Sequence, residues 1–293
     1  MTGTNSDGSI TIAIVNWNTR DLLIQALQSI YCQEFVSPLR VVVVDNASKD
    51  GSAEAVRNRF PQCELIVNKE NVGYARGNNQ VLETTTSQFT LLLNPDVILP
   101  NHCLQTVVQF MHDHPNAGAL GVKQVHPDGS LQRSVRGFPT PMGIFCDICG
   151  LSRLLPNNRR VGSYRMTWMD YSSVEEVDQP MGTFLLLRGT ALESVGLLDE
   201  DFPIFFNEVD WCLRCKRAGW KIFYTPDVAI IHYGGAGTMQ VGSAMAWESR
   251  RALLTFYKKH YSSALYLPIR LFIAIASWPH AWLQSRRRKR ASK

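Results

Sequence analysis

The chain has 293 residues, of which 45% are hydrophobic and 19% are charged. These fractions are near the average of globular proteins, so they exclude a disordered or fibrous chain and allow one large domain or two small ones. The net charge of +5 equals the charge of the single run RRRKR at residues 286–290. The rest of the chain is therefore close to neutral, and we do not expect a basic face that binds nucleic acid.

The chain up to about residue 118 alternates between β-rich and helical patterns. Residues 39–44 (LRVVVV) form a continuous apolar run, as a strand buried on both faces requires. Strands are predicted at 9–17, 39–44, 64–67 and 89–93, and helices at 21–31, 52–60, 74–84 and 101–112. This β-α-β-α order predicts an α/β fold with a mostly parallel central sheet flanked by helices.

From residue 119 the pattern changes to shorter elements. The turn sequence HPDGS separates two predicted strands at 119–125 and 131–136. Residues 137–179 are irregular, and a segment of this length without regular structure is typical of a functional or mobile loop. Further elements are predicted as a strand at 184–187, helices at 190–195 and 209–218, and a strand at 228–232.

Residues 239–293 have a different character. Residues 243–260 predict an amphipathic helix, whereas residues 264–283 are apolar almost all round but contain Pro268, Arg270 and Pro279. A membrane span needs about 20 uninterrupted apolar residues, so this segment matches a span poorly. Apolar surface followed by a basic run favours a peripheral membrane segment, with a core or oligomer helix as the alternative. The oligomeric state stays open.

The seven cysteines indicate a reducing compartment. Their number is odd, and no basic and then apolar leader sequence precedes them, so we expect a cytoplasmic protein at the inner face of the cytoplasmic membrane. Two pairs have C-x-x-C spacing, Cys146/Cys149 and Cys212/Cys215. The gap between the pairs is too long for a compact zinc site.

Polar side chains follow four predicted strands. They are Asn16 and Asn18 after the first strand, Asp45 after the second, NVGYARGN at 71–78 after the third, and Asn94 and Asp96 after the fourth. Ligands of open α/β sheets bind beyond the carboxyl ends of the strands, so these residues are expected at one edge. Asp45 is placed to bind a ribose or base, Asp96 a hard cation, and Arg76 a phosphate. Each residue alone also fits a turn or a helix cap, and the interpretation depends on their joint placement.

The second half of the chain adds two carboxylates and a histidine. Glu208 and Asp210 lie two residues apart near a predicted helix start, beside aromatic residues. A partly desolvated carboxylate there would have a raised pKa and act as a general base, although helix N-termini favour acidic residues in any case. His232 ends the last predicted strand and is a candidate metal ligand or phosphate contact, against the commoner structural role of a lone histidine.

Seven motifs occur in consistent order between about residues 10 and 237. They are IVNWN, VVVVDNASKDGS, NVGYARGNN, LLLNPD, QPMGTFLLLRG, FFNEVDWCLRCKRAGW and IIHYGG. Together they resemble the family 2 inverting glycosyltransferases, and most nearly the bacterial rhamnosyltransferase-like members. The resemblance implies a GT-A fold over residues 9–238, with a nucleotide-binding half at about 9–118 and an acceptor half at about 119–238.

The resemblance also implies an activity. It implies a metal-dependent hexosyltransferase that moves a sugar from a nucleotide diphosphate donor to a hydroxyl of a glycan or lipid-linked glycan, in cell-surface polysaccharide synthesis. Rhamnose from dTDP-rhamnose is the expected sugar, and a UDP-sugar is the alternative.

Site residues follow from the same motifs by position. The implied donor contacts are Asn16, Asn18, Asp45, Asn71, Gly73, Arg76, Asn78 and Asn94, and the implied acceptor-side residues are Met181, Gly182 and Thr183. Asp96 and His232 match positions that bind Mg²⁺ or Mn²⁺. Glu208 matches the catalytic base, with Asp210 as the other candidate.

Two positions depart from the family pattern. Asn94 replaces the first aspartate of the D-x-D motif, and Asn207 replaces the glutamate of the usual Glu-Asp pair. These changes keep open a non-catalytic protein that binds nucleotide sugars on the same scaffold.

Two other enzyme classes do not fit. A nicotinamide-dependent oxidoreductase needs G-x-G-x-x-G after the first strand, where this chain has NWNTR. A nucleotidyltransferase would carry a glycine-rich and basic loop at the same place, which this sequence lacks.

Overall fold

Runs of β-branched residues build the parallel part of the central sheet. In this computed structural model, which describes residues 8–235, 240 and 242–291, the strands are β1 (Ile10–Asn16), β2 (Leu39–Asp45), β3 (Glu64–Val67) and β4 (Phe89–Leu93). They lie parallel in the order β3-β2-β1-β4. The connecting helices are α1 (Arg20–Tyr31), α2 (Ser52–Arg59) and α3 (Tyr74–Leu82). The predicted α/β order is confirmed, with boundaries within two residues.

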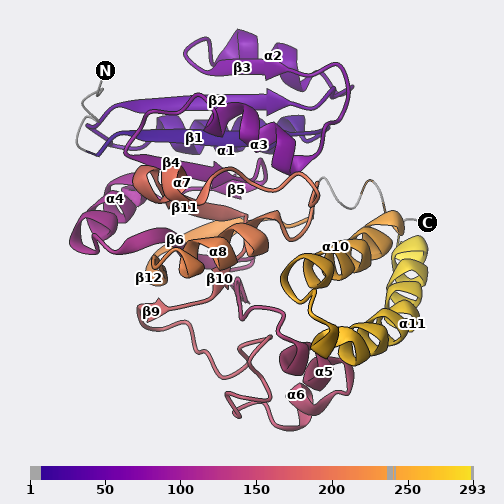
Figure 1. Cartoon of the computed structure of the whole chain (residues 1–293). Helices are drawn as coiled ribbons and strands as arrows, with labels where there is room; N and C mark the ends of the chain where they lie inside the picture. Colours follow the sequence, from indigo (N-terminus) through magenta and orange to yellow (C-terminus); the bar gives the residue numbers. More distant parts are fainter. Residues whose placement is uncertain (1–7, 236–239, 241, 292–293) are drawn as a thin grey trace.

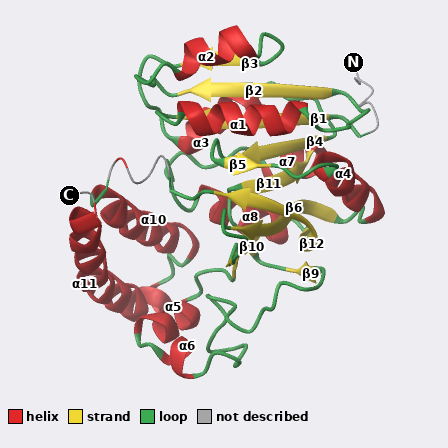
Figure 2. Cartoon of the chain, turned by 180° about the vertical axis from the view of Figure 1, so that it is seen from behind, coloured by secondary structure: helices red, strands yellow, loops and turns green. Residues whose placement is uncertain are grey.

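Both faces of this sheet are buried. Val41 and Val43 of β2 belong to one hydrophobic core, and Val42 and Val44 belong to the other, because successive side chains of a strand point to opposite faces. Helices α1, α2 and α4 (Cys103–Asp113) cover the first face. Helices α3, α7 (Gly189–Val195) and α8 (Asn207–Arg217) cover the second (Figure 1; Figure 2).

The same sheet continues into the second half of the chain with a mixed strand order. β11 (Phe184–Arg188) runs antiparallel between β4 and β6 (Ala117–Val125). β12 (Lys221–His232) is parallel to β6, and β5 (Val97–Ile98) pairs antiparallel with its end. The complete path is β3-β2-β1-β4-β11-β6-β12-β5.

Two strand predictions were wrong in extent. The strand expected at 131–136 divides into β7 (Leu131–Gln132), which pairs with β6, and β8 (Val135–Arg136), which pairs with β10 (Gln179–Pro180). The strand expected at 228–232 begins at Lys221 instead. Pro226 and a register shift between Thr225 and Ala229 interrupt its pattern, since proline cannot donate to a sheet ladder.

The segment 137–179 is more regular than its sequence suggests. It contains α5 (Pro141–Ile148), α6 (Leu151–Leu154) and the short strand β9 (Glu175–Glu176). Thr140 caps α5 by accepting a hydrogen bond from Gly143 N, and a proline at the first helical position favours this start. The prediction of an irregular segment was therefore wrong for these helices, which are stabilised by contacts with distant residues.

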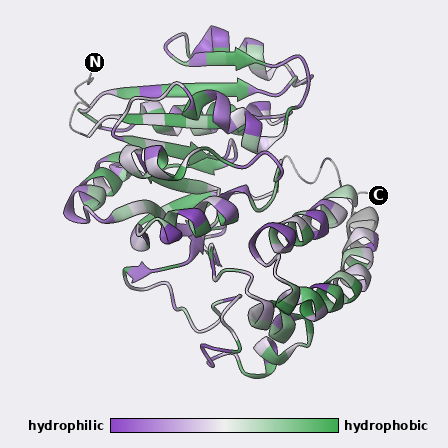
Figure 3. Cartoon of the chain, in the orientation of Figure 1, coloured by the Kyte–Doolittle hydropathy of each residue, from purple (hydrophilic) through white to green (hydrophobic). Residues whose placement is uncertain are grey.

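A helical lobe lies beside the sheet. It consists of α5, α6, α10 (Ala244–His260), the turn η1 (Ala264–Tyr266) and α11 (Leu267–Ala291) (Figure 1). A third hydrophobic cluster, which includes Phe202, Phe256 and Ile273, joins the lobe to the loop before α8. Figure 3 shows hydrophobic residues on α5 and on the part of α11 beside it. Within the described residues, no helix is both long and apolar enough to cross a membrane.

The loop that precedes α8 is tied to the start of α3. The backbone N–H groups of Tyr74 and Ala75 donate to the carbonyl of Pro203, at 2.6 and 3.2 Å. Gly73 precedes them with φ of +88°, and a Cβ there would lie 2.9 Å from the same carbonyl, so the turn requires glycine. Further along α3, Asn79 exchanges two hydrogen bonds with the backbone of Leu198. These contacts hold α8 in place against the parallel half of the sheet.

We predict that Asn79→Ala lowers the free energy of unfolding by about 2 kcal/mol, because it leaves a buried N–H and C=O of Leu198 without partners. Urea unfolding followed by circular dichroism measures this change. Glu83→Ala, an exposed change at the end of the same helix, is the control and should cost less than about 0.5 kcal/mol. Equal stability of the two variants would contradict the role given to Asn79.

Candidate active site

A cavity of about 650 Å³ lies at the carboxyl ends of the parallel strands. It is lined by residues that follow β1, β2, β3 and β4, and by residues of the second half of the chain. These are Val15, Trp17, Thr19, Asn46, Asn71, Val72, Gly73, Tyr74, Asn94, Pro95, Asp96, Met181, Thr183, Pro203, Ile204, His232, Gly235 and Met245. The cavity is thus built where an open α/β sheet binds its ligands.

Several residues singled out in the sequence line this cavity. They are Asn71, Gly73, Asn94, Asp96, Met181, Thr183 and His232. Asn71 shapes its own turn, because its Oδ1 accepts a hydrogen bond from the N–H of Gly73 at 3.0 Å. Asn94 lines the cavity together with Asp96, two residues further along.

Asn16 and Asp45 do not line the cavity. Asn16 Nδ2 donates to Asp45 Oδ1 at 2.9 Å, and the N–H of Ser48 donates to Asp45 Oδ2 at 3.0 Å. Asn16 Oδ1 accepts from the hydroxyl of Thr19 at 2.6 Å. Both side chains are buried, and they hold together the loops after β1 and β2.

The remaining donor candidates lie apart from the cavity. Asn18 has a positive φ of 51°, and its Oδ1 accepts from the N–H of Lys49. Arg76 is exposed on α3. Asn78 is buried, and its Nδ2 donates to the carbonyl of Tyr74 at 2.9 Å.

Other cavity residues were not picked out from the sequence. Trp17 lies between Asn16 and Asn18, and Tyr74 lies within the NVGYARGN motif. Both could therefore have been predicted as site residues from the motifs that contain them. The hydroxyl of Tyr74 donates to the carbonyl of Gly182 at 2.9 Å and so joins the two halves of the cavity. Met245 comes from α10, and no sequence pattern connects it with the site.

Asp96 and His232 form a buried pair in the cavity wall. His232 Nδ1 lies 2.7 Å from Oε1 of Gln132, an oxygen that can only accept, so Nδ1 carries the ring proton. The other nitrogen, Nε2, is buried without a hydrogen-bond partner and lies 3.4 Å from Asp96 Oδ1. When the ring is neutral, the lone pair of Nε2 therefore faces a carboxylate oxygen. A divalent cation suits both atoms as ligands.

Glu208 lies in the first turn of α8, next to the cavity. A Cβ placed on Gly182 would lie 3.5 Å from both Cβ and Cγ of Glu208, which is an ordinary van der Waals distance, so the two residues are close neighbours. Met181 and Thr183, the sequence neighbours of Gly182, both line the cavity. Desolvation raises the pKa of Glu208 to about 7, because burial disfavours the ionised carboxylate.

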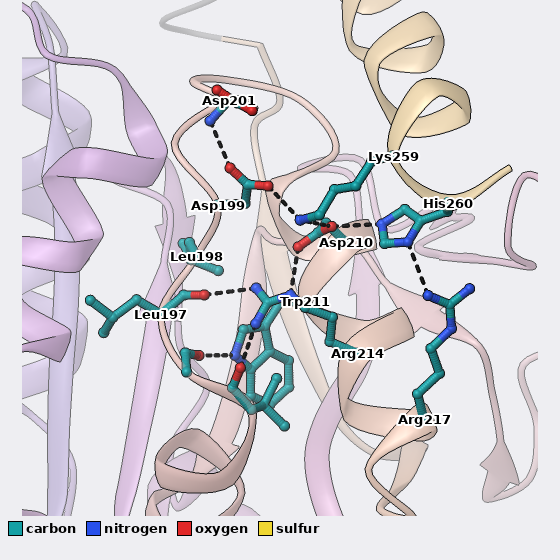
Figure 4. Close-up of polar contacts among 12 residues, drawn as sticks. Leu197, Leu198, Asp199, Asp201, Asp210, Trp211, Arg214, Arg217, Lys259 and His260 are labelled. Atoms are coloured by element: carbon teal, nitrogen blue, oxygen red, sulfur yellow. Dashed lines mark hydrogen bonds and ion pairs between the residues drawn. The ribbon is translucent and has the colours of Figure 1, made fainter. Parts of the chain in front are cut away.

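Asp210, two residues further along, has the opposite environment (Figure 4). It is fully buried and accepts hydrogen bonds from Arg214 Nε, Lys259 Nζ and His260 Nε2, each at 2.7 Å. Burial by itself would raise the pKa of Asp210, but the hydrogen bonds from these three groups outweigh it and lower the pKa to about 2. Asp210 is therefore ionised at neutral pH, and its oxygens are occupied.

The partners of Asp210 extend the network to other elements. Arg214 also donates to the carbonyls of Val195 and Leu197, and Lys259 also pairs with Asp199 (Figure 4). His260 Nδ1 lies 3.1 Å from an Arg217 nitrogen, which can only donate, so the ring is neutral with its proton on Nε2. The network attaches α10 to α8.

The fold and the family agree on the class of this protein. The profile of Glycosyl transferase family 2 matches residues 11–174, more than half of the chain, and the α/β architecture is the GT-A fold. The chain belongs to the family 2 glycosyl transferases.

Two relatives with similar sequences are rhamnosyltransferases. N-acetylglucosaminyl-diphospho-decaprenol L-rhamnosyltransferase of Mycobacterium tuberculosis is 28% identical over 213 residues, which are 69% of this chain and 68% of that protein. Rhamnosyltransferase WbbL of Escherichia coli is 27% identical over 146 residues, 50% of this chain and 52% of that protein. The structure of the mannosyltransferase PcManGT from Pyrobaculum calidifontis, in complex with GDP-Man and Mn²⁺, matches with a TM-score of 0.56 at 19% identity. That match covers 97% of this chain and 74% of the mannosyltransferase.

We predict that Asp210→Asn lowers the free energy of unfolding by about 2 kcal/mol at pH 6, since a neutral amide replaces the buried carboxylate that Arg214, Lys259 and His260 share. The folded-state pKa is depressed, so the stabilisation by Asp210 is present above its unfolded pKa of about 4 and is lost as the pH falls towards 2. The difference between wild type and variant should therefore shrink below pH 4. Urea unfolding across this range measures it.

The matched control for this prediction is Asp201→Asn, an exposed aspartate in the preceding loop. It should stay within about 0.5 kcal/mol of wild type at every pH. A constant difference between wild type and Asp210→Asn down to pH 3 would contradict the assigned ionisation.

Proposed function

We propose that this protein transfers rhamnose from dTDP-rhamnose to a hydroxyl of a glycan or lipid-linked glycan, with inversion at the anomeric carbon and with Mg²⁺ or Mn²⁺ bound. The sugar assignment is supported by the rhamnosyltransferases among its relatives. The observation that carries the proposal is the buried pair of Asp96 and His232 in the wall of the cavity, where Nε2 of His232 has no hydrogen-bond partner and lies 3.4 Å from Asp96 Oδ1.

The donor would lie in the large cavity. We assign residues 9–118 to the nucleotide-binding half and 119–238 to the acceptor half of the transferase. Asn71, Gly73 and Asn94 are the proposed donor contacts that reach the cavity directly. Asn16 and Asp45 support these contacts by holding the loops after β1 and β2. Met181 and Thr183 form the acceptor side of the same cavity.

Asp96 and His232 would hold the divalent cation. Gln132 keeps Nε2 of His232 directed towards Asp96, because its Oε1 accepts a hydrogen bond from the Nδ1–H group. The cation would supply positive charge to the diphosphate as it leaves.

Glu208 is the proposed general base. Its pKa is about 7, so at physiological pH a large part of Glu208 is ionised and can accept a proton from a hydroxyl. The acceptor oxygen then attacks the anomeric carbon, and the nucleotide diphosphate leaves from the opposite side, which inverts the configuration. Asp210 is the less suitable base, because three donors occupy its oxygens. The proposed role of Asp210 is to hold α8, and thereby Glu208, in position.

The C-terminal segment 239–293 is the proposed membrane contact, at the inner face of the cytoplasmic membrane. One face of α11 is buried, at Ile273, Ser277, Ala281 and Ser285. The other face exposes large apolar side chains at Leu267, Leu271, Ile275, Trp278 and Trp282. An exposed apolar face with tryptophans, followed in sequence by RRRKR, suits the surface of an anionic bilayer.

We predict that dTDP with Mn²⁺ raises the melting temperature of the protein by several degrees, since a ligand that binds only the folded state stabilises it. Asp96→Asn and His232→Gln should each remove the part of the shift that depends on Mn²⁺ and keep the part given by dTDP alone. Asp113→Asn, an exposed aspartate on α4, should behave as wild type.

The same assay with UDP and GDP tests the nucleotide. A larger shift with UDP would replace the rhamnose donor by a UDP-sugar. The absence of any shift with folded protein would contradict the transferase assignment and favour a scaffold without donor binding.

We predict that Glu208→Gln lowers kcat by about 10³-fold and leaves the nucleotide-dependent melting shift unchanged, since the amide cannot accept the proton. In wild type, kcat/KM should fall below pH 7 by about tenfold per pH unit, because Glu208 becomes protonated there. Release of the nucleotide diphosphate from labelled donor measures both. Glu193→Gln on α7 is the control. Full activity of Glu208→Gln would place the base elsewhere.

A further inference from the structure

A second cavity, of about 440 Å³, lies in the helical lobe between α5 and α6 on one side and α10 and α11 on the other. It shares no lining residue with the donor cavity. Its lining combines apolar residues with three arginines. The residues are Ile144, Asp147, Ile148, Gly150, Arg153, Tyr164, Arg165, Phe206, Ala246, Ser249, Arg250, Leu253, Ala276, Ser277, Ala281 and Leu283.

The charges of this cavity are not balanced within it. Arg165 pairs with Asp147, the single acidic residue of the lining. Arg250 donates through Nη2 to the carbonyl of Ala274 at 2.8 Å, but its Nε is buried without a hydrogen-bond partner. Arg153 is exposed. Three arginines against one aspartate, with a buried donor left over, suit a ligand that carries more than one negative charge.

The cavity also reaches the surface at apolar residues. Ile148 and Leu283 belong to its lining and are themselves 36% and 50% exposed. Leu154 on α6 and Trp282, next to Leu283 on α11, are exposed as well. The lining also has a hydrocarbon part, from Ile144, Leu253 and the alanines of α10 and α11. A ligand that fits this cavity is therefore an amphiphile with an anionic group.

The residues around Glu208 belong to the two cavities. Phe206 lines the second cavity and is the N-cap residue of α8, two residues before Glu208. Tyr164 also lines it and packs against the same hydrophobic cluster as Phe206. Glu208 lies within van der Waals reach of Gly182, whose neighbours Met181 and Thr183 line the donor cavity. The proposed base thus lies between residues that line the two cavities.

We infer that the second cavity binds the lipid-diphosphate part of the acceptor, with the arginines holding the diphosphate and the apolar wall holding the first part of a prenyl chain. This inference rests on the proposed function, and it adds the place and the chemical class of the acceptor. A sugar attached to that diphosphate would extend past Phe206 and Tyr164 towards Glu208. The rest of the lipid chain would leave the cavity at Ile148 and Leu283, beside the exposed apolar face of α11.

The test uses the full-length protein and farnesyl diphosphate as a probe in isothermal titration calorimetry. Wild type should bind farnesyl diphosphate at least about tenfold more tightly than farnesol or inorganic diphosphate, because each of these lacks one half of the recognised group. Equal affinity for farnesol would overturn the role of the arginines. Equal displacement of the probe by vesicles of anionic phospholipid would also overturn the inference, in favour of a lipid-headgroup site.

Two variants locate the binding within the molecule. Arg153→Ala removes an exposed charge and should weaken the binding of farnesyl diphosphate about tenfold. Ala276→Phe should fill part of the cavity and weaken binding to a similar extent without changing charge. Arg160→Ala removes an exposed arginine of the same segment that does not line the cavity, and should bind as wild type. If all three variants bind the probe as wild type does, the inference is wrong.

The melting shift with dTDP and Mn²⁺, measured on the same preparations, separates this inference from the proposed function. A normal shift together with unaltered binding of the probe in Arg153→Ala and Ala276→Phe would refute the acceptor cavity and leave the transferase assignment standing. No shift in wild type, together with probe binding that these variants weaken, would refute the transferase assignment and support an anionic lipid site in this cavity.

Discussion

The attachment of the loop before α8 to the start of α3 is the contact on which the arrangement of the site depends. The carbonyl of Pro203 accepts the first free N–H groups of α3, and Asn79 secures Leu198 one turn further along. Helix N-termini need such acceptors, and a backbone carbonyl supplies one without a charged side chain. Since Gly73 permits the close approach, the turn before α3 and the loop before α8 are held as one unit.

The two carboxylates of α8 have opposite pKa shifts because their surroundings differ. Glu208 is desolvated without a cation close by, so its pKa rises to about 7. Asp210 is even more deeply buried, but Arg214 and Lys259 surround it and keep it ionised. Opposite environments two residues apart give one group that exchanges protons near neutral pH and one that fixes the helix. The same network attaches α10, whose Met245 contributes to the donor cavity.

The helical lobe connects the site with a surface of a different kind. α5 and α11 pack together although they are far apart in the sequence, and with α6 and α10 they enclose a cavity with three arginines. The exposed face of α11 is apolar, while the larger cavity combines polar residues at the strand ends, such as Asn94 and Asp96, with apolar ones. Under our proposals, the water-soluble donor and the lipid-linked acceptor approach Glu208 from different sides.

The sequence by itself determined the parallel half of the sheet, because buried strands and amphipathic helices have periods that are visible locally, as in LRVVVV at β2. Its motifs also marked Asn94, Asp96 and His232, which meet in the donor cavity. The sequence pointed to Glu208 as the base and kept Asp210 as the other candidate, since both stand at a helix start. The difference between their environments depends on the tertiary structure, because Lys259 and His260 come from α10, about fifty residues away. The division of the strand at 131–136, the helices within 137–179 and the position of Met245 likewise depend on contacts between distant segments, and no local pattern records such contacts.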